Sequence, residues 1–509
     1  MAVQTPHHVI EDAPVPDKVP KGVEANGINS IPEHEHKGRP ASLFLPWFAS
    51  NVGVFGISYG AFALTALFGL SLWQAIVSGV VGIVLSFILV GVVAIAGPRA
   101  SAPTMIISRA AFGVRGNRVA AILSWMLNVG WETSLVVVGT LAFAAVCSKL
   151  GLGGGTGVKI IGIAIILVLT ILGGVAGFDV IMRLQGLITV VAGVLTVLVI
   201  ALSASHVHLA VVNRIPNGSS ANFVGMIVFA MVGFGLGWVY SGADYSRYLP
   251  RRSSRSSVVW WTTFGGAIGP VILFVYGVLL AGSSKAVLSQ IGGDPIGALT
   301  AVLPHWFLVP FIVLTVLGLV GATVLDIYSS GLNLQSAGLK LPRYQAAAID
   351  GTLMTVLGVY VVFFTTNFLG VFQGFLITLG VPIAAWAGIV IADTILRRRD
   401  YAIGELYDTA GRYGDVRAWP MFLLVAGSLI GFGLVVNTYA GWLKWQGYLL
   451  GPLGLGGKTG TWANASVGVI VALAIGFVGT LFTRGQIRSQ EAGTEAAADA
   501  ASVPVTSGI

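Results

Sequence analysis

The sequence predicts an all-α integral membrane protein with about twelve transmembrane helices. Only 9% of its 509 residues are charged and 55% are apolar, whereas roughly 25% of the residues of a soluble domain are charged. Apolar runs of about 20 residues, long enough to cross roughly 30 Å of hydrocarbon, recur about twelve times along the chain. Two of these runs, five spans apart, are interrupted by glycines, which predicts an inverted repeat of five plus five helices followed by two peripheral helices.

The apolar runs give the domain organisation. We expect spans near 44–69, 73–96, 118–148, 158–177, 184–204, 222–249, 258–282, 305–337, 344–366, 368–396, 418–440 and 463–483. The ten-helix inverted-repeat core then covers 43–396, a cytoplasmic loop covers 397–417, and the two peripheral helices lie within 418–483. The polar N-terminal residues 1–42 and the Ala-, Ser- and Glu-rich residues 484–509 have no apolar periodicity, and we expect both to be disordered tails.

The first and sixth spans are the glycine-interrupted ones. The first contains Gly53, Gly56 and Gly60 around Asn51 and Ser58. The sixth contains four glycines within ten residues, at Gly233, Gly235, Gly237 and Gly242. Discontinuous helices near the bilayer midplane are typical of substrate sites in transporters. Close packing against neighbouring helices is the alternative explanation, because small residues also serve that purpose.

The third span carries a polar and aromatic stripe in an otherwise apolar helix. Its members recur at helical spacing and are Trp125, Asn128, Trp131 and Glu132. A carboxyl group inside a membrane span is costly and is by default a functional residue. Hydrogen bonding to a neighbouring helix is the alternative role for Asn128 and Glu132.

The eighth span carries a second stripe at spacings of three and four, formed by Thr323, Asp326, Ser329, Ser330 and Asn333. In a five-plus-five repeat the third and eighth spans are symmetry partners, so we expect Glu132 and Asp326 to face one central cavity. Apolar surroundings favour the protonated acid, which suits a proton carrier and also a neutral structural carboxyl. Interhelical hydrogen bonding is therefore the alternative for this stripe.

The positions of the basic residues predict the orientation. With the N-terminus inside, 22 of the 28 Lys and Arg residues fall on the cytoplasmic side, as the positive-inside rule requires. Both termini are then cytoplasmic, and the protein is a multi-pass protein of the cell membrane. The net charge of +8 is explained by topology, so a nucleic-acid partner is not needed.

Other classes fit the residues less well. A channel needs a continuous polar lining or a charged ring, but the polar stripes occupy the middle of a few spans. The seven histidines lie in the tail, in loops or at a helix start, which does not suit a membrane enzyme or a metal site. The single Cys147 excludes an intramolecular disulfide. We therefore expect no enzyme activity, no cofactor and no metal.

Four motifs resemble the nucleobase:cation symporter-1 family, and within it the purine-cytosine permease branch. They are GPRASAPTMIISRAAFG (97–113), NVGWE (128–132), ADYSRYLP (243–250) and LDIYSSGLNLQ (325–335). The resemblance covers roughly residues 40–485, and four motifs in order are more specific than any one. It implies the same five-plus-five fold with two further helices, and transport of a small flat heterocycle.

The resemblance also implies the binding residues. In this family a flat heterocycle is held between an aromatic residue on the third helix and one at the break of the sixth, with side-chain amides on its edge. Trp131 matches the first aromatic residue and Asn128 a ring-binding polar residue. At the sixth-helix break, Phe234 and Trp238 are the aromatic candidates and Gly235 offers main-chain groups. From the two stripes and the first break we add Thr323 and Ser58 as substrate-binding candidates.

The chain departs from sodium-coupled members of the family. These members use hydroxyl side chains on the eighth helix to coordinate the ion, and the matching positions here are Gly321 and Ala322. We therefore expect proton symport of a nucleobase, cytosine or a purine, with Glu132 and Asp326 as proton carriers in a functional monomer. The alternative is a sodium- or proton-coupled permease for hydantoin, allantoin, uracil or a vitamin.

Overall fold

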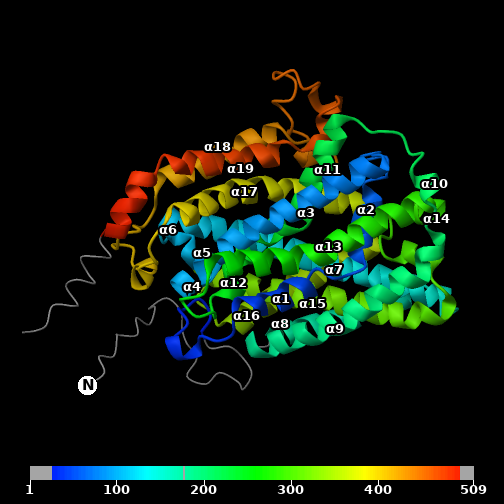
Figure 1. The fold of residues 1–509 in the computed structure, drawn as a ribbon, viewed down its shortest axis with the longest axis horizontal. Helices are drawn as coiled ribbons and strands as arrows, with labels where there is room; N and C mark the ends of the chain where they lie inside the picture. Colours follow the sequence, from blue (N-terminus) through cyan, green and yellow to red (C-terminus); the bar gives the residue numbers. More distant parts are fainter. Residues whose placement is uncertain (1–25, 176–177, 493–509) are drawn as a thin grey trace, which may run out of the picture.

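Long helices run side by side through the molecule (Figure 1). The computed structural model describes residues 26–175 and 178–492, and no strand occurs within these ranges. In this part of the chain, nine helical stretches are long and apolar enough to span a membrane. They are α3–α4 (Leu72–Ala94, Ala96–Ala100), α7 (Asn117–Lys149), α8 (Thr156–Val175), α9 (Phe178–Ser203), α11–η4–α12 (Ser220–Gly233, Gly235–Ser241, Gly242–Ser246), α13 (Arg255–Ser283), α15 (Leu308–Ser336), α16 (Arg343–Phe364) and α17 (Phe368–Leu396).

Three further spans complete the predicted twelve. The first span is split into α1 (Phe44–Ala49) and α2 (Phe55–Phe62), each too short to cross a membrane alone. The last two are α18 (Ala418–Gly433) and α19 (Gly468–Leu481), which pack on each other and on α17. They lie at the edge of the bundle (Figure 1). The prediction of a broken first and sixth helix and two peripheral helices is confirmed.

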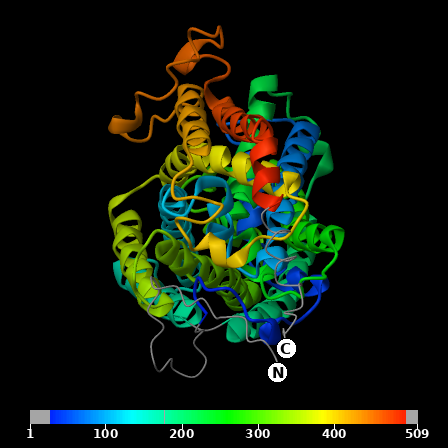
Figure 2. The ribbon, with the colours of Figure 1, turned by 90° about the vertical axis from the view of Figure 1, so that its left-hand side faces the viewer.

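The contacts between helices follow the expected repeat. The third and eighth spans, α7 and α15, pack along each other near the centre of the bundle. Each of them also contacts both α8 and α16, the fourth and ninth spans. Likewise α2 of the first span packs on α13, the seventh, and α11 of the sixth packs on α3, the second. Helices five spans apart therefore make equivalent contacts, and Figure 2 shows the resulting bundle from one end.

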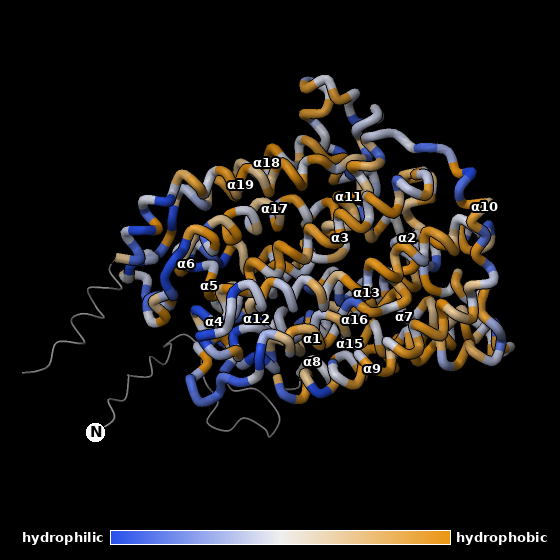
Figure 3. Tube along the Cα trace, viewed as in Figure 1, coloured by the Kyte–Doolittle hydropathy of each residue, from blue (hydrophilic) through white to orange (hydrophobic). Residues whose placement is uncertain are grey.

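The outer helices present apolar side chains to the surroundings. Only 28% of the apolar window of α8 and of α9 is buried, against 83% for α11–η4–α12. Leu172 on α8 and Val190 and Val197 on α9 are more than 60% exposed. Large apolar residues on an exposed surface fit a lipid environment, and long orange stretches mark hydrophobic residues along the helices in Figure 3.

The two ends of the bundle differ in polarity, with hydrophilic residues gathered at the left in Figure 3. We call this the basic end, and the other the opposite end. The basic end carries α4, α5 (Thr104–Ile107), α6 (Arg109–Phe112) and the loops 247–254, 337–342 and 397–417. The opposite end carries α10 (Leu209–Val212), α14 (Lys285–Gln290) and η5 (Gly297–Val302).

Residues 26–39, which we call the N-terminal strap, are folded against the basic end, although the sequence predicts disorder over 1–42. Ile28 and Ile31 are buried at 3% and 2% exposure. The Arg247 guanidinium donates to the Gly27 carbonyl (2.8 Å), and the Tyr407 hydroxyl donates to the Ile28 carbonyl (2.8 Å). Burial of these two isoleucines holds the strap against the bundle. The polar composition of the segment does not predict this contact. Residues 1–25 lie outside the described residues.

The C-terminal segment behaves in the same way up to residue 492. Residues 484–492, also predicted to be disordered, form a helix bent by 54° from α19. Its Glu491 carboxylate accepts from the main-chain amides of Arg398 and Arg399 at 2.7 and 2.9 Å. The residues that follow α17 are thereby hydrogen-bonded to the helix 484–492. Residues 493–509 lie outside the described residues.

Candidate functional site

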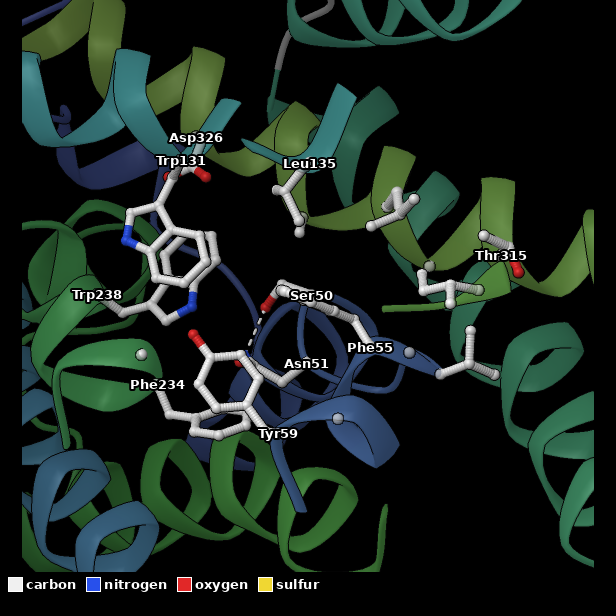
Figure 4. A pocket seen from close by; sticks show the side chains of 18 residues that line it. Ser50, Asn51, Phe55, Tyr59, Trp131, Leu135, Phe234, Trp238, Thr315 and Asp326 are labelled. Atoms are coloured by element: carbon white, nitrogen blue, oxygen red, sulfur yellow. Dashed lines mark hydrogen bonds between the residues drawn. The ribbon is translucent and has the colours of Figure 1, made fainter. Parts of the chain in front are cut away.

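A cavity lies at the centre of the bundle, between the two helix breaks (Figure 4). The break of the first span contributes Ser50, Asn51 and Gly53, and the break of the sixth contributes Gly233 and Phe234. The remaining walls come from α2, α7, η4, α15 and Ile296 just before η5. Discontinuous helices thus meet at one cavity, as the glycine pattern predicts.

The break of the sixth span has a specific packing cause. Phe234 ends α11 with a non-helical backbone (φ −122°, ψ −109°), and the chain continues as a 3-10 helix. Its neighbour Gly235 donates its amide to Ser86 Oγ of α3 at 3.1 Å. A Cβ at Gly235 would lie 2.3 Å from the Ser86 carbonyl carbon. Only glycine allows the broken helix to approach α3 this closely.

The first break is stabilised by its own polar side chain. Asn51 Nδ2 donates to the Trp47 carbonyl and to Ser50 Oγ, both at 2.9 Å. These bonds hold the turn that separates α1 from α2. The Cα atoms of Gly53 and Gly318 of α15 also approach closely here, since a Cβ at Gly318 would lie 3.3 Å from Gly53 Cα.

Five aromatic side chains line the cavity: Phe55, Tyr59, Trp131, Phe234 and Trp238. The rings of Tyr59 and Phe234 lie 4.6 Å apart, tilted by 52°. Trp238 packs edge-on against Trp47 at 5.9 Å, and Trp131 against Phe372 at 5.2 Å. These neighbours hold the indole rings in place. Rigid aromatic faces around a cavity suit stacking with a flat ring.

Two hydrogen-bond donors of these rings have no partner among the described residues. They are the Tyr59 hydroxyl and Trp131 Nε1, and both atoms are buried. Buried polar groups are nearly always hydrogen-bonded, so these two are unusual. In Figure 4 both rings border the cavity, and Trp131 Nε1 lies beside Gly237 of η4.

The cavity also contains one carboxyl group, that of Asp326 on α15. Its Oδ1 accepts from the Tyr240 hydroxyl (2.8 Å) and from Asn128 Nδ2 (3.1 Å). Asn128 in turn accepts from Asn333 Nδ2 at 2.8 Å. The side chains of α7, η4 and α15 thus form one polar network, and Asp326 is its member that borders the cavity.

The structure brings together some of the predicted site residues and not others. Trp131, Phe234, Trp238 and Asp326 line the cavity, and Gly235 follows directly after Phe234. Asn128 is fully buried behind Asp326, and its amide is occupied by protein partners.

Two predicted hydroxyl groups lie outside the cavity lining. Ser58 donates to the Pro295 carbonyl at 2.5 Å, and Thr323 donates to the Leu319 carbonyl at 2.8 Å. Each hydroxyl is therefore satisfied by a main-chain carbonyl. Helical spacing placed them on the correct spans but could not show which face of the span reaches the cavity.

Glu132 does not line the cavity, although the sequence predicts that it faces the cavity together with Asp326. It lies one helical turn beyond Asn128, on the same face of α7. It is fully buried, and neither carboxylate oxygen has a hydrogen-bond partner among the described residues. No basic residue is paired with it in that part of the chain. Burying a polar group without a hydrogen-bond partner is costly.

Sequence reasoning missed three residues that matter here: Tyr59, Tyr240 and Asp350. Tyr59 is on the glycine-interrupted first span, and the aromatic residue between Gly56 and Gly60 was the available signal. Tyr240 belongs to the sixth-span break. Asp350 on α16 is a lone carboxyl in an apolar run, fully buried and bonded to Trp125 Nε1 at 2.5 Å.

The positions that depart from sodium-coupled family members are also defined by the structure. The Gly321 carbonyl accepts from Gln185 Nε2 of α9 at 2.9 Å. Ala322 lines the cavity with a methyl group. This stretch of α15 therefore offers an occupied carbonyl and an apolar side chain, a poor ligand set for a hard cation.

Comparison with known proteins agrees with the fold and the motifs. Residues 30–451 match the family described as "Permease for cytosine/purines, uracil, thiamine, allantoin". Among relatives, the putative purine-cytosine permease YxlA of Bacillus subtilis (strain 168) is 25% identical over 411 residues, covering 77% of this chain and 84% of that protein. The vitamin B6 transporter TPN1 of Saccharomyces cerevisiae is 25% identical over 344 residues, covering 64% of this chain and 57% of that protein.

Solved structures share the fold. Mhp1, a nucleobase-cation-symport-1 family transporter in a closed conformation with bromovinylhydantoin bound, superposes with a TM-score of 0.64 at 18% identity, covering 93% of this chain and 99% of that one. A Na+-coupled sialic acid symporter in its substrate-bound outward-open state gives 0.60 at 11% identity, covering 92% of each chain. The family match spans most of the chain, so this multi-pass membrane protein belongs to the cytosine/purine permeases of the nucleobase:cation symporter-1 family.

Proposed function

We propose that the protein imports a nucleobase, cytosine or a purine, across the cell membrane by proton symport through alternating access. The observation that supports this most is the cavity between the two helix breaks, which is lined by aromatic rings and bordered by Asp326. A nucleobase is flat and offers two π faces for stacking. Its shape therefore suits this aromatic lining.

Proton coupling is supported by the carboxyl groups next to the aromatic rings. Asp326 borders the cavity, and Glu132 lies behind it without a basic partner among the described residues. A proton bound there would move with the substrate when the repeats rearrange. A membrane potential of about 100 mV contributes roughly 2.3 kcal/mol per charge, enough for more than tenfold accumulation.

The orientation follows from charge. We assign the basic end to the cytoplasm because most Lys and Arg residues lie there. The N-terminal strap lies across that end through the contacts of Arg247 and Tyr407. The cavity lining instead extends toward the opposite end, to Ile296 and Thr315. This arrangement fits a state closed toward the cytoplasm, ready to take substrate from outside.

Uptake of labelled cytosine into proteoliposomes tests both parts of the proposal. We expect an imposed inward pH gradient to drive accumulation without sodium, and unlabelled purines to compete. An uptake that follows a sodium gradient and ignores the pH gradient would overturn proton coupling. A panel containing hydantoin, allantoin, uracil and vitamins tests the cargo. Competition by one of these, but by neither unlabelled cytosine nor a purine, would reassign it.

A further inference from the structure

The region behind the cavity contains a third buried carboxyl group, which the proposed mechanism does not yet use. Asp350 lies on α16 and has no exposed surface. Its Oδ1 accepts from Trp125 Nε1 of α7 at 2.5 Å, and its Oδ2 has no hydrogen-bond partner among the described residues. An apolar residue would fill this position without the cost of a half-satisfied carboxyl.

Asp350 is near Glu132, one of the two carboxyl groups already assigned to coupling. Its helix α16 packs on both α7 and α15. Ser330 of α15, one helical turn beyond Asp326, also lies near Asp350. The helices α7, α15 and α16 thus each contribute polar side chains to the region between them.

None of the three carboxyl groups is paired with a basic residue among the described residues, which distinguishes them from other buried acids of the chain. Asp393, for example, is paired with Arg397 at 2.7 Å. The groups facing Asp350 are Trp125 and Glu132 from α7 and Ser330 from α15, while α8 contributes the apolar Ile171 beside Gly351. Neighbouring carboxyl groups without a counter-charge hold protons in common, because they cannot all ionise together.

We propose that Asp350 is a third proton-carrying residue, which receives the coupling proton from the Asp326–Glu132 pair and carries it away from the substrate path. In this step the donor is left as a carboxylate and Asp350 becomes the neutral acid, so charge and protons balance. The free Oδ2 is the accepting atom, and Ser330 provides a hydroxyl near Asp350. The inference rests on the proposed proton symport.

The variant Asp350→Asn tests the proposal, because it keeps the acceptor for Trp125 and removes the titratable group. In proteoliposomes we expect cytosine binding within about twofold of the wild type and exchange of internal for external cytosine to be retained. Accumulation driven by a pH gradient should fall at least tenfold. Asp350→Glu should restore part of it. Asp408→Asn serves as the matched control, because Asp408 is exposed and its carboxylate accepts from the Ala410 amide, an acceptor that Asn keeps.

The outcomes separate this inference from the proposed function. If the wild type shows no proton-driven uptake, both are overturned. If the wild type is proton-driven and Asp350→Asn accumulates cytosine with the same pH profile, only the role of Asp350 is overturned. Equal loss of binding, exchange and accumulation, without rescue by Asp350→Glu, would assign Asp350 to structure instead.

Discussion

At the level of single residues, Trp131 decides how strongly a flat ligand is held. Its indole lines the cavity and is fixed by Phe372. We expect Trp131→Ala to weaken nucleobase affinity by about 1 to 3 kcal/mol, the usual contribution of base–aromatic stacking. Competition binding measures the change, and Trp260→Ala, at a side chain that is 60% exposed, is the control. Unchanged affinity in a well-expressed Trp131→Ala would remove this residue from the site.

The hydroxyl of Tyr59 allows a finer test. Tyr59→Phe keeps the ring that packs on Phe234 and removes only the unpartnered donor. If the substrate accepts from this hydroxyl, affinity should fall by about 0.5 to 1.5 kcal/mol. Inhibition constants for a series of bases with and without the matching acceptor measure this. An equal effect on all of them would mean that the hydroxyl does not contact the ligand.

At the level of elements, the sixth-span break depends on one close contact. Gly235→Ala would place a methyl group 2.3 to 2.6 Å from main-chain atoms of α3. We expect loss of folded protein or a strongly lowered melting temperature, because neither backbone can move away cheaply. Gly186→Ala on α9 is the matched control, since nothing lies within 4 Å of its added Cβ. A melting temperature of Gly235→Ala equal to that of the wild type would show that the break tolerates separation from α3.

The N-terminal strap should respond to pH through His36. Burial, followed by the charge of Arg251, lowers the pKa of His36 below its usual 6.5. The ring contacts Ser101 Oγ at 3.1 Å in the docked strap. Docking is favoured by the neutral ring, so its contribution is complete above pH 6.5 and is lost as the pH falls through the lowered pKa.

Hydrogen exchange of residues 26–39 measures this effect. After correction for the intrinsic pH dependence of exchange, protection should be lower at pH 5.5 than at pH 7.5. His36→Gln should remove the difference. The same difference in the variant and the wild type would show that another group controls the strap.

At the level of the whole molecule, the charge asymmetry predicts which end faces the cytoplasm. In a Cys147→Ser background, a cysteine at Lys458 should react with a membrane-impermeant maleimide in intact cells. A cysteine at Arg398, on the basic end, should react only after the membrane is opened. The reverse pattern would invert the proposed topology. Labelling yields on a gel are sufficient to decide between them.

The sequence was sufficient for the architecture of the whole molecule, because span length, glycine interruptions and basic loops are each local signals. The sequence also predicted four of the residues that line the cavity, namely Trp131, Phe234, Trp238 and Asp326. It could not show that the amide of Asn128 is used by Asp326, Tyr240 and Asn333, since those partners come from distant segments. Contacts between helices are set by tertiary packing, which helical spacing alone does not determine.

The cavity lining comes from two kinds of element. Most of its aromatic rings belong to the two discontinuous spans, whereas Asp326 lies on the continuous helix α15. Under the proposed function, replacing an aromatic residue at a break leaves this carboxyl group in place. Cargo could then change in evolution without a change of driving force, which fits a family described by cargoes as different as purines, thiamine and allantoin.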